Sequence, residues 1–282
     1  MTRTLARQIT WSILGLTLFS SLAVIGPSQT QTPAAADLRG VIRLRVRIGS
    51  GEGAKAKGLA RKRFFLIKGS LEENKSLMQS IEQQPLLSRD CYYRGLGASE
   101  ALIHWLRESD CESIYCREVE AKDVEGAGAV REFQEAIAAG EKDFGSRELA
   151  RKWLTVNLSD QIRDGYYRRR QDELQTLLKH AEQVSKATVL SVMTDLNGTA
   201  FFTDLEPGTY VVSNILATEI FGNSASFWNC EVKVKPGDLA TEKPFLISNP
   251  GNKDPRDVRN IKCRSVDKPL PACPTANANS GN

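Results

Sequence analysis

The spacing of apolar residues along this 282-residue chain changes twice, and this change limits the folds it can adopt. Residues 40–49 alternate strictly between apolar side chains and arginines, which is typical of a half-buried β-strand. Residues 63–67 form a second apolar run, residues 70–186 show helical spacing, and alternation returns from residue 187. Two strands cannot bury a core alone, so we expect the first two to pack with the later ones. The helical stretch would then be an insertion. The alternative, two sequential domains, would leave the first strand pair without partners.

Serine residues at several points predict where the helices of this stretch begin. Ser70 is followed three residues later by Glu73, the spacing of a capping box, and Ser99, Ser146 and Ser159 also stand before apolar arcs. The longest predicted helix follows Ser159. Its apolar stripe consists of Ile162, Tyr166, Leu174, Leu177, Ala181 and Val184.

Two turn signals lie close together in the second strand-rich part. Asn197-Gly198 favours a two-residue hairpin of type I′, which needs positive φ at both central residues. Glu206-Pro207-Gly208 favours a second turn, in which the glycine takes the left-handed position. Further strands are expected at residues 188–193, 199–203, 209–216, 227–234 and 243–248. The prediction is therefore an α+β chain: a seven-stranded antiparallel β-sandwich interrupted by a helical insertion after its second strand.

The segment around these turns resembles a known family. Residues 194–212, TDLNGTAFFTDLEPGTYVV, are similar to the repeated pattern of carboxypeptidase-regulatory-like, transthyretin-like and Cna-B-type sandwich domains. The matching positions are Asp195, Asn197, Gly198, Phe202, Leu205, Pro207, Gly208, Tyr210 and Val212. The resemblance covers about residues 40–69 and 187–248. It implies an immunoglobulin-like sandwich of an exported protein, in most cases without catalytic activity, and it leaves residues 70–186 unassigned.

The N-terminus predicts export. Arg3 and Arg7 precede an uncharged apolar run over residues 9–26, and small residues follow at Ala34 and Ala36. Residues 1–36 are therefore interpreted as a signal peptide or an N-terminal anchor. The other predicted parts are the sandwich at 37–69 plus 187–249, the helical insertion at 70–186 and a tail at 250–282. Removal of residues 1–36 lowers the formal charge from +4 to +2, so nothing in the charge implies nucleic acid.

Six cysteines fit an exported chain. An even number in an oxidising compartment favours disulfides, although the sequence does not select among the 15 pairings of six residues. Three lie before residue 187 and three after it, so complete pairing requires at least one bond between the two halves. The candidates are Cys91, Cys111, Cys116, Cys230, Cys263 and Cys273.

The sequence contains no clear catalytic, metal or cofactor motif. His104 and His180 stand in separate predicted helices on polar faces, and Asp195-x-Asn197-Gly198 lacks the later glutamate of a calcium loop. The notable surface feature is a candidate anion or glycan patch formed by Tyr167, Arg168, Arg169 and Arg170. Arg43, Arg45 and Arg47 would add a basic sheet face. The alternative for the first group is a solvated helix face with Tyr166 pointing inward.

These observations predict an exported protein in the periplasm, outside the cell or in the envelope. The leading hypothesis is a non-catalytic bacterial-type cell-envelope protein whose sandwich presents the helical insertion to an envelope protein or polysaccharide. Contact with a membrane is expected only through residues 1–36, if they are not cleaved. The alternatives are an exported hydrolase with a site between insertion and sandwich, and a purely structural stalk. No cofactor and no nucleic acid are expected.

Overall fold

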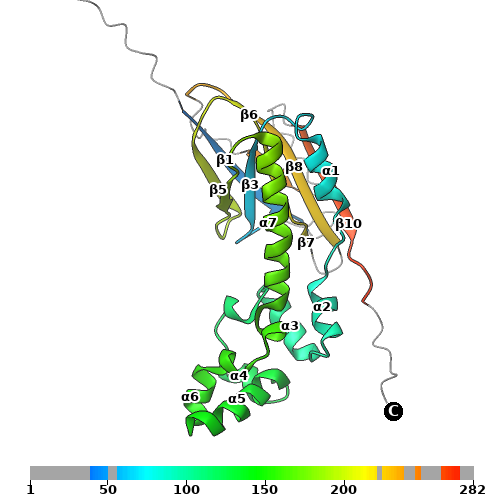
Figure 1. Ribbon diagram of the computed structural model, residues 1–282. Helices are drawn as coiled ribbons and strands as arrows, with labels where there is room; N and C mark the ends of the chain where they lie inside the picture. The colour runs from blue at the N-terminus through cyan, green and yellow to red at the C-terminus, as the bar shows by residue number, and fades with distance from the viewer. Residues whose placement is uncertain (1–38, 50–55, 221–223, 238–244, 249–261, 274–282) are drawn as a thin grey trace, which may run out of the picture. The chain divides into compact units, whose positions relative to one another are not determined.

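The computed structural model describes residues 39–49, 56–220, 224–237, 245–248 and 262–273 (Figure 1). The predicted signal segment at 1–36 lies outside these residues. The strands are β1 (Gly40–Ile48), β2 (Lys57–Gly58), β3 (Arg63–Lys68), β4 (Leu190–Met193), β5 (Thr199–Leu205), β6 (Gly208–Ser213), β7 (Thr218–Ile220), β8 (Ser224–Val234), β9 (Phe245–Ser248) and β10 (Lys262–Pro269). The α-helices are α1 (Lys75–Gln83), α2 (Arg89–Gly95), α3 (Glu100–Glu108), α4 (Ala121–Val124), α5 (Arg131–Phe144), α6 (Arg147–Lys152) and α7 (Tyr166–Ser185). The protein is therefore α+β, as predicted.

The strands form two sheets. In the first sheet β1 pairs with β2, β5 and β9, and in the second the order is β10-β8-β6-β3-β4, with β7 beside β8. The sheets are antiparallel except for one pair, since β9 runs parallel to β1. The pairing confirms two predicted partnerships: β5 pairs with β1, and both β4 and β6 pair with β3.

The two sheets pack face to face over one apolar core, which makes the β-sandwich. From β1 the core receives Ile42, Leu44 and Val46, the apolar side of the predicted alternation. β8 contributes a matching row on the opposite sheet, namely Trp228, Cys230 and Val234, with Val232 partly buried against it. The period of two predicted both faces, because successive side chains of a strand point to opposite sides.

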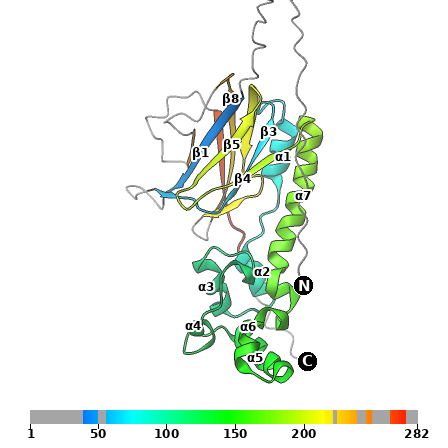
Figure 2. The ribbon, with the colours of Figure 1, turned by 90° about the vertical axis from the view of Figure 1, so that its left-hand side faces the viewer.

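Helices α1 and α7 cover the other face of the second sheet. A separate core joins Phe65 and Ile67 of β3 to Leu77 of α1 and to Leu174 and Leu177 of α7. Figure 2 shows α1 and α7 on the side of the sandwich away from β1 and β5. The layers over these residues are thus sheet, sheet and helices.

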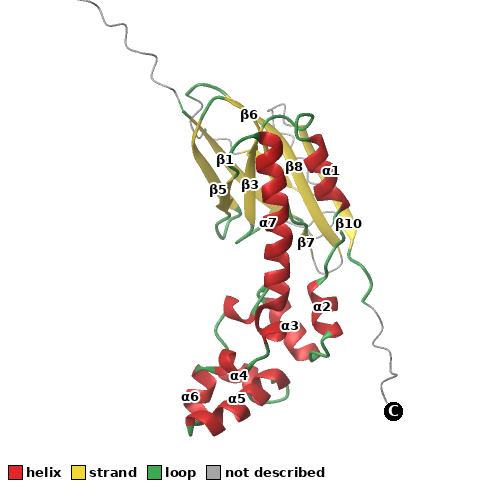
Figure 3. Ribbon diagram, viewed as in Figure 1, coloured by secondary structure: helices red, strands yellow, loops and turns green. Residues whose placement is uncertain are grey.

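Helices α2 to α6 pack around a third apolar core. Its largest buried side chains include Tyr93, Trp105, Phe133 and Tyr166. Figure 3 shows these helices gathered next to the lower end of α7. Because Tyr166 lies in this core and Leu177 in the previous one, the helix α7 connects the two. Whether residues 70–186 fold as a unit of their own stays a prediction.

Helix beginnings follow two of the four predicted serine caps, and two differ. Ser159 accepts the N–H of Ile162 at 3.4 Å, but Gln161–Gly165 form a π-helix, and the α-helix α7 begins only at Tyr166. The side chains of Ser99 and Ser146 accept hydrogen bonds at the starts of α3 and α6. Ser70 and Glu73 do form the reciprocal hydrogen bonds of a capping box, but the α-helix begins only at Lys75. The short helix α2, capped by Ser88, was not predicted, because Tyr93 is the only apolar side chain that it buries.

The two predicted turns have a different geometry from the one expected. Both join strands of different sheets: the chain passes from β4 in the second sheet to β5 in the first, and returns to the second sheet after Pro207. The type I′ prediction at Asn197-Gly198 is wrong, because only Gly198 has positive φ (76°). Asp195 explains this: its side chain accepts the N–H groups of Asn197 and Thr199, both at 2.8 Å, which stabilises a longer turn. In the second turn, the positive φ falls on Asp204 (58°) and not on Gly208.

The strand count and the tail also differ from prediction. The described residues contain ten strands, not seven; β2 and β7 are short additions within predicted loops. Residues 262–269 lie in the segment predicted to be an irregular tail, yet they form β10, which pairs with β8 along its length. This segment alternates no apolar residues, so its pairing depends on the free edge of β8 and on a disulfide.

All six cysteines are paired, which confirms the prediction of disulfides. The Cα atoms of the pairs lie 4.7, 5.7 and 4.0 Å apart, and the sequence separations are 182, 5 and 33 residues. The first of these bonds supplies the predicted link between the two halves of the chain. In the same order, the pairs are Cys91–Cys273, Cys111–Cys116 and Cys230–Cys263.

Candidate functional site

A cleft of about 700 Å³ lies between the sandwich and the helical residues. Its walls come from five parts of the chain that are far apart in sequence. They are residues 59–65, Arg89, residues 108–116, residues 166–174 of α7 and residues 193–219. A concave site at the junction of two packed parts is a common position for a binding site.

Arg89, the first residue of α2, lies at the base of this cleft. Its side chain is only 6% exposed. Its Nη1 donates to the carbonyl oxygen of Cys111 at 3.1 Å and lies 3.5 Å from Asp110 Oδ1. Its Nε lies 3.7 Å from Asp90 Oδ1. A buried guanidinium needs such partners, because an unpaired charge in an apolar interior is strongly destabilising.

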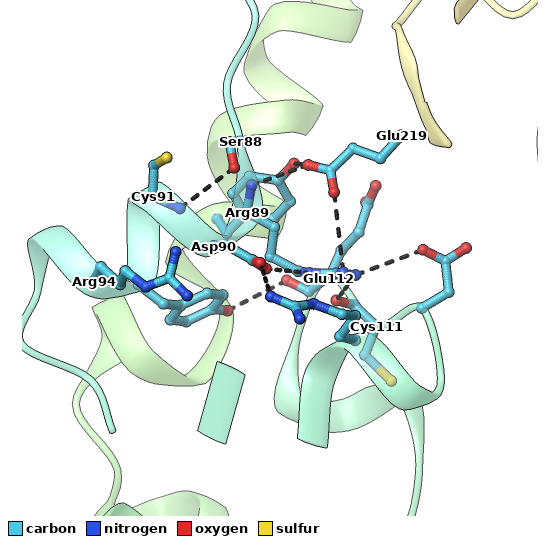
Figure 4. Close-up of polar contacts among 12 residues, drawn as sticks. Ser88, Arg89, Asp90, Cys91, Arg94, Cys111, Glu112 and Glu219 are labelled. Carbon is cyan, nitrogen blue, oxygen red and sulfur yellow. Dashed lines mark hydrogen bonds and ion pairs between the residues drawn. The ribbon is translucent and has the colours of Figure 1, made fainter. Parts of the chain in front are cut away.

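Glu219, on β7, contacts Arg89 from the sandwich side of the cleft (Figure 4). Its Oε1 accepts the backbone N–H of Arg89 at 3.0 Å, and its Oε2 lies 3.9 Å from Arg89 Nη2. The hydroxyl of Tyr166 lies 3.3 Å from Glu219 Oε1 and 3.1 Å from the carbonyl oxygen of Leu87. Burial raises the pKa of Tyr166, so this hydroxyl keeps its proton and acts as a donor.

A buried asparagine stabilises the loop between β6 and β7, the strand that carries Glu219. The side chain of Asn214 donates to Thr218 Oγ1 at 3.0 Å and to the carbonyl oxygen of Ser226 at 2.9 Å. Its Oδ1 accepts the backbone N–H of Trp228 at 2.9 Å. These bonds to β8 replace backbone pairing between β6 and β8, which is why the strand predicted to reach Leu216 ends at Ser213.

The other carboxylates of the cleft are also paired with cations. Lys62 forms a close ion pair with Asp110, and Arg107 forms one with Asp90. Arg170 Nε lies 3.4 Å from Glu112 Oε1, and its Nη2 donates to the carbonyl oxygen of Ala217 at 3.0 Å. The fourth carboxylate that lines the cleft, Glu108, lies 3.4 Å from Arg117. Each of the four carboxylates in the lining therefore has a cationic partner.

The mouth of the cleft, in contrast to its base, combines arginines that lack an ion-pair partner among the described residues with exposed apolar side chains. Arg61 and Arg63 line it, are exposed, and have no carboxylate within ion-pair distance among the described residues. Three exposed large side chains line the same cleft: Met193 (54%), which is the strand neighbour of Arg63, Leu196 (74%) and Tyr167 (43%). Exposed apolar side chains that gather next to unpaired cations are typical of a contact surface.

The predicted patch of Tyr167 and three arginines is divided between two surfaces. Arg170 faces the cleft with Tyr167, whereas Arg168 pairs with Asp164 at 2.8 Å on the exposed side of α7. Arg169 Nε lies 3.9 Å from Glu173. Tyr166 points inward, as expected for the alternative reading of this stretch. Binding of an anion or glycan by these residues stays a prediction.

Sequence reasoning did not find the residues at the base of the cleft. Arg89 and Glu219 are 130 positions apart, and neither stands in a motif. The left-handed φ of Asp110 (51°), which turns the chain after α3 and directs its carboxylate toward Lys62, has no sequence signal either. Only Ser88, which caps α2, could have suggested that a helix begins at Arg89.

Metal binding finds no support in this part of the chain. Among the described residues, no group of three or more histidine, cysteine or acidic side chains is placed to hold an ion. His104 is exposed and lies 3.6 Å from Glu108. The disulfide of Cys111 and Cys116 forms part of the cleft wall, so these sulfurs serve as structure there.

Comparisons with known proteins add little to this geometry. No protein-family model matches the chain, and no curated protein matches it. Among solved structures, it is similar to the pilus backbone protein RrgB from Streptococcus pneumoniae, at 9% sequence identity and a TM-score of 0.25. The similarity covers 75% of this chain and 40% of that protein. We draw no conclusion from this likeness, and the sandwich assignment depends on the strand pairing above.

Two further features of the described residues concern their helices and their cysteines. None of their helices is long and apolar enough to cross a membrane. Three disulfides are typical of proteins that fold in an oxidising compartment, such as the cell envelope or the exterior of the cell.

Proposed function

We propose that this protein is a non-catalytic, exported cell-envelope protein that binds a segment of a partner polypeptide in the cleft. The observation that carries the proposal is the mouth of the cleft, where unpaired arginines and exposed apolar side chains lie together. An extended segment with acidic and apolar side chains complements both. A glycan would leave Met193 and Leu196 without an apolar counterpart, which favours a polypeptide over a polysaccharide at this site.

The base of the cleft supports binding more than catalysis. Glu108, Asp110, Glu112 and Glu219 each lie beside a cationic side chain. The paired charges fix the two walls relative to each other, which suits a preformed binding site. An exported hydrolase remains the alternative.

The proposal includes a role for each part. The sandwich, of the carboxypeptidase-regulatory-like or transthyretin-like type, would be the rigid scaffold. The helical residues inserted after β3 would supply the second wall. Function is commonly placed on insertions and loops that a rigid scaffold positions.

Peptide selection on the purified chain tests this function. Random peptides displayed on phage are selected against the immobilised protein, and the affinities of enriched peptides are then measured by calorimetry. We expect enrichment of acidic peptides with at least one large apolar residue. Absence of any enriched peptide, or enrichment of basic ones, would contradict the proposal.

Two matched pairs of variants locate the binding. Arg63→Glu and Leu196→Glu change the mouth of the cleft, and each should weaken binding at least tenfold. Arg151→Glu and Leu149→Glu place the same changes on α6, outside the cleft, where Leu149 is 45% exposed. These controls should bind as the unmodified protein does. Equal losses in both pairs would show that binding does not use the cleft.

A further inference from the structure

The outer face of the first sheet carries a row of three arginines that lies outside the cleft. Arg43, Arg45 and Arg47 stand at alternate positions of β1, opposite the apolar row that enters the sandwich core. Alternate residues of a strand are about 6.8 Å apart, so the row places three cations over roughly 14 Å. β1 is a central strand, with β5 on one edge and β9 also paired to it. The row therefore has a backbone held by strand pairs along its whole length.

These arginines lack the partners that others in the protein have. Arg89, Arg94 and Arg168 each pair with a carboxylate, whereas Arg43, Arg45 and Arg47 have none within 4.0 Å among the described residues. Within the described parts of the chain, the one side-chain hydrogen bond of the row runs from Arg47 Nη2 to the carbonyl oxygen of Ala56, at 3.0 Å. An Arg row without anions on a protein of nearly balanced charge is a local excess of positive charge.

The side chains of the row are also held in place. All three are half-buried, and their Nε atoms are shielded from solvent and have no hydrogen-bond partner within the described structure. The guanidinium of Arg43 lies 5.7 Å from the ring centre of Phe201, its direct neighbour on β5, and that ring is 46% exposed. A cation over an aromatic ring is stabilised, and restricted side chains lose less entropy when they bind a ligand.

We propose that this row binds a linear acidic polysaccharide along β1. Three evenly spaced cations match a chain of repeated carboxylates better than they match a single small anion. Each guanidinium offers a planar fork that fits a carboxylate with two parallel hydrogen bonds. The exposed ring of Phe201 adds a flat apolar surface beside the row, which suits the apolar face of a sugar ring. None of these four residues lines the cleft, so the site is independent of the function proposed above.

The test uses the purified chain and a defined polyanion. An oligogalacturonate of about ten sugars is the probe, and the same oligomer with its carboxylates methyl-esterified is the uncharged control. We expect binding of the acid form, which weakens as sodium chloride is raised from 50 to 500 mM because salt screens the charges. Equal binding of the esterified form, or no binding of the acid form at 50 mM salt, would overturn the proposal. Binding of inorganic polyphosphate but not of oligogalacturonate would also overturn it.

Variants with matched charge show where on the protein the oligogalacturonate binds. Replacing Arg43, Arg45 and Arg47 together by Gln should reduce the affinity at least tenfold. The control replaces Arg151, Arg168 and Arg169 by Gln, which removes the same charge from exposed positions of α6 and α7. The control should keep its affinity within twofold. A larger loss in the control than in the row variant would assign the probe to the helices.

A single substitution keeps the test informative if the triple variant does not fold. Arg45→Gln leaves Arg43 on Phe201 and Arg47 on Ala56. With circular dichroism confirming the fold, we expect a threefold to fivefold loss of affinity. An unchanged affinity in this folded variant would count against the row as the binding site.

Discussion

Arg89 shows how a single buried side chain joins the two walls of the cleft. It contacts Asp90 within α2, Asp110 after α3 and Glu219 on β7. Each carboxylate has a second polar contact, so the charges stabilise one another as a network. Removal of Arg89 would take away the cation that all three carboxylates share.

Substitution of Arg89 tests this network. Arg89→Met should lower the free energy of unfolding by about 3–5 kcal/mol, because the largely buried Glu219 loses the one cationic partner that it has among the described residues. The matched control is Arg94→Met on the same helix. Arg94 pairs with Glu100 at 2.7 Å on the surface, so its loss should change stability by less than about 1 kcal/mol. Urea unfolding at pH 7 measures both, and equal effects of the two variants would contradict the network.

The carboxylate of Glu132, on α5, should make the stability of the protein depend on pH. Burial alone would raise its pKa, but hydrogen bonds from the side chain and backbone of Ser99 and from its own backbone outweigh burial and lower it below 4.5. A lowered pKa in the folded state means that the stability from this carboxylate is complete above the unfolded value and is lost as pH falls through the folded value. Glu132→Gln should therefore destabilise by about 1–3 kcal/mol at pH 7, and the difference should shrink as the pH falls below 4.5.

The control for this prediction is Glu135→Gln, an exposed position one turn further along α5. It should change stability little at any pH. Denaturant unfolding at a series of pH values from 7 down to 3 compares the two variants with the unmodified chain. A deficit of Glu132→Gln that is constant over this range would exclude the carboxylate as its cause.

At the scale of elements, β5 explains why the two turn signals are so close. β5 lies in the first sheet, whereas β4 before it and β6 after it lie in the second. The two turns beside β5 therefore carry the chain from one sheet to the other and back, and neither closes a hairpin. Gly198 permits the first crossing, because Val46 N donates to its carbonyl oxygen at 2.7 Å and Gly58 lies against the same turn. The backbones approach too closely there for a side chain.

Gly198→Ala tests this close approach. A Cβ at this position would meet Val46 O and would lie 2.7 Å from Leu59 N, in addition to the strain of positive φ. Gly97→Ala is the matched control, since Gly97 has φ of 74° but no atom within 4 Å of an added Cβ. We expect Gly97→Ala to lower the free energy of unfolding by about 1 kcal/mol, from backbone strain alone. Gly198→Ala should lower it by more than about 3 kcal/mol. Thermal unfolding of both variants measures the difference, and similar losses would show that the contact can relax.

The sequence predicted the elements that have a strong period or a local cap. The alternation in β1 and β8, the caps of α3 and α6 and the stripe of α7 were all visible, because they depend on neighbouring residues. β10 was missed, because it has no apolar alternation and depends on pairing with β8. The strand at β9 was predicted, but its parallel pairing with β1 was not, because the apolar pattern of a strand does not identify its partner. The base of the cleft was hidden, because Arg89, Asp110 and Glu219 meet only in the folded chain.

At the scale of the whole molecule, α7 and one disulfide connect the parts. α7 has 20 residues, about 30 Å of helix, and contributes to the core of the helical residues and to the layer on the sandwich. The bond between Cys91 and Cys273 closes a separation of 182 residues. Both connections restrain the two walls of the cleft.

The disulfides should differ in their contribution to stability according to the loops that they close. If a disulfide stabilises by lowering the entropy of the unfolded chain, closing the loop of Cys91–Cys273 adds about 5 kcal/mol to the free energy of unfolding. Closing the loop of Cys111–Cys116 adds about 2 kcal/mol. Replacing each pair by serine and measuring urea unfolding tests this order. A larger loss from the Cys111 and Cys116 pair would contradict it and would show that the short bond stabilises by fixing the cleft wall.

The measurement that tests the central claim most directly is hydrogen exchange of the whole chain with and without a peptide selected for binding. The account predicts slower exchange at residues 59–63, 108–116, 166–171, 193–196 and 214–219, which face the cleft. It predicts no change at residues 131–152 of α5 and α6. Protection confined to α5 and α6, or to the outer face of β1, would contradict the cleft as the binding site.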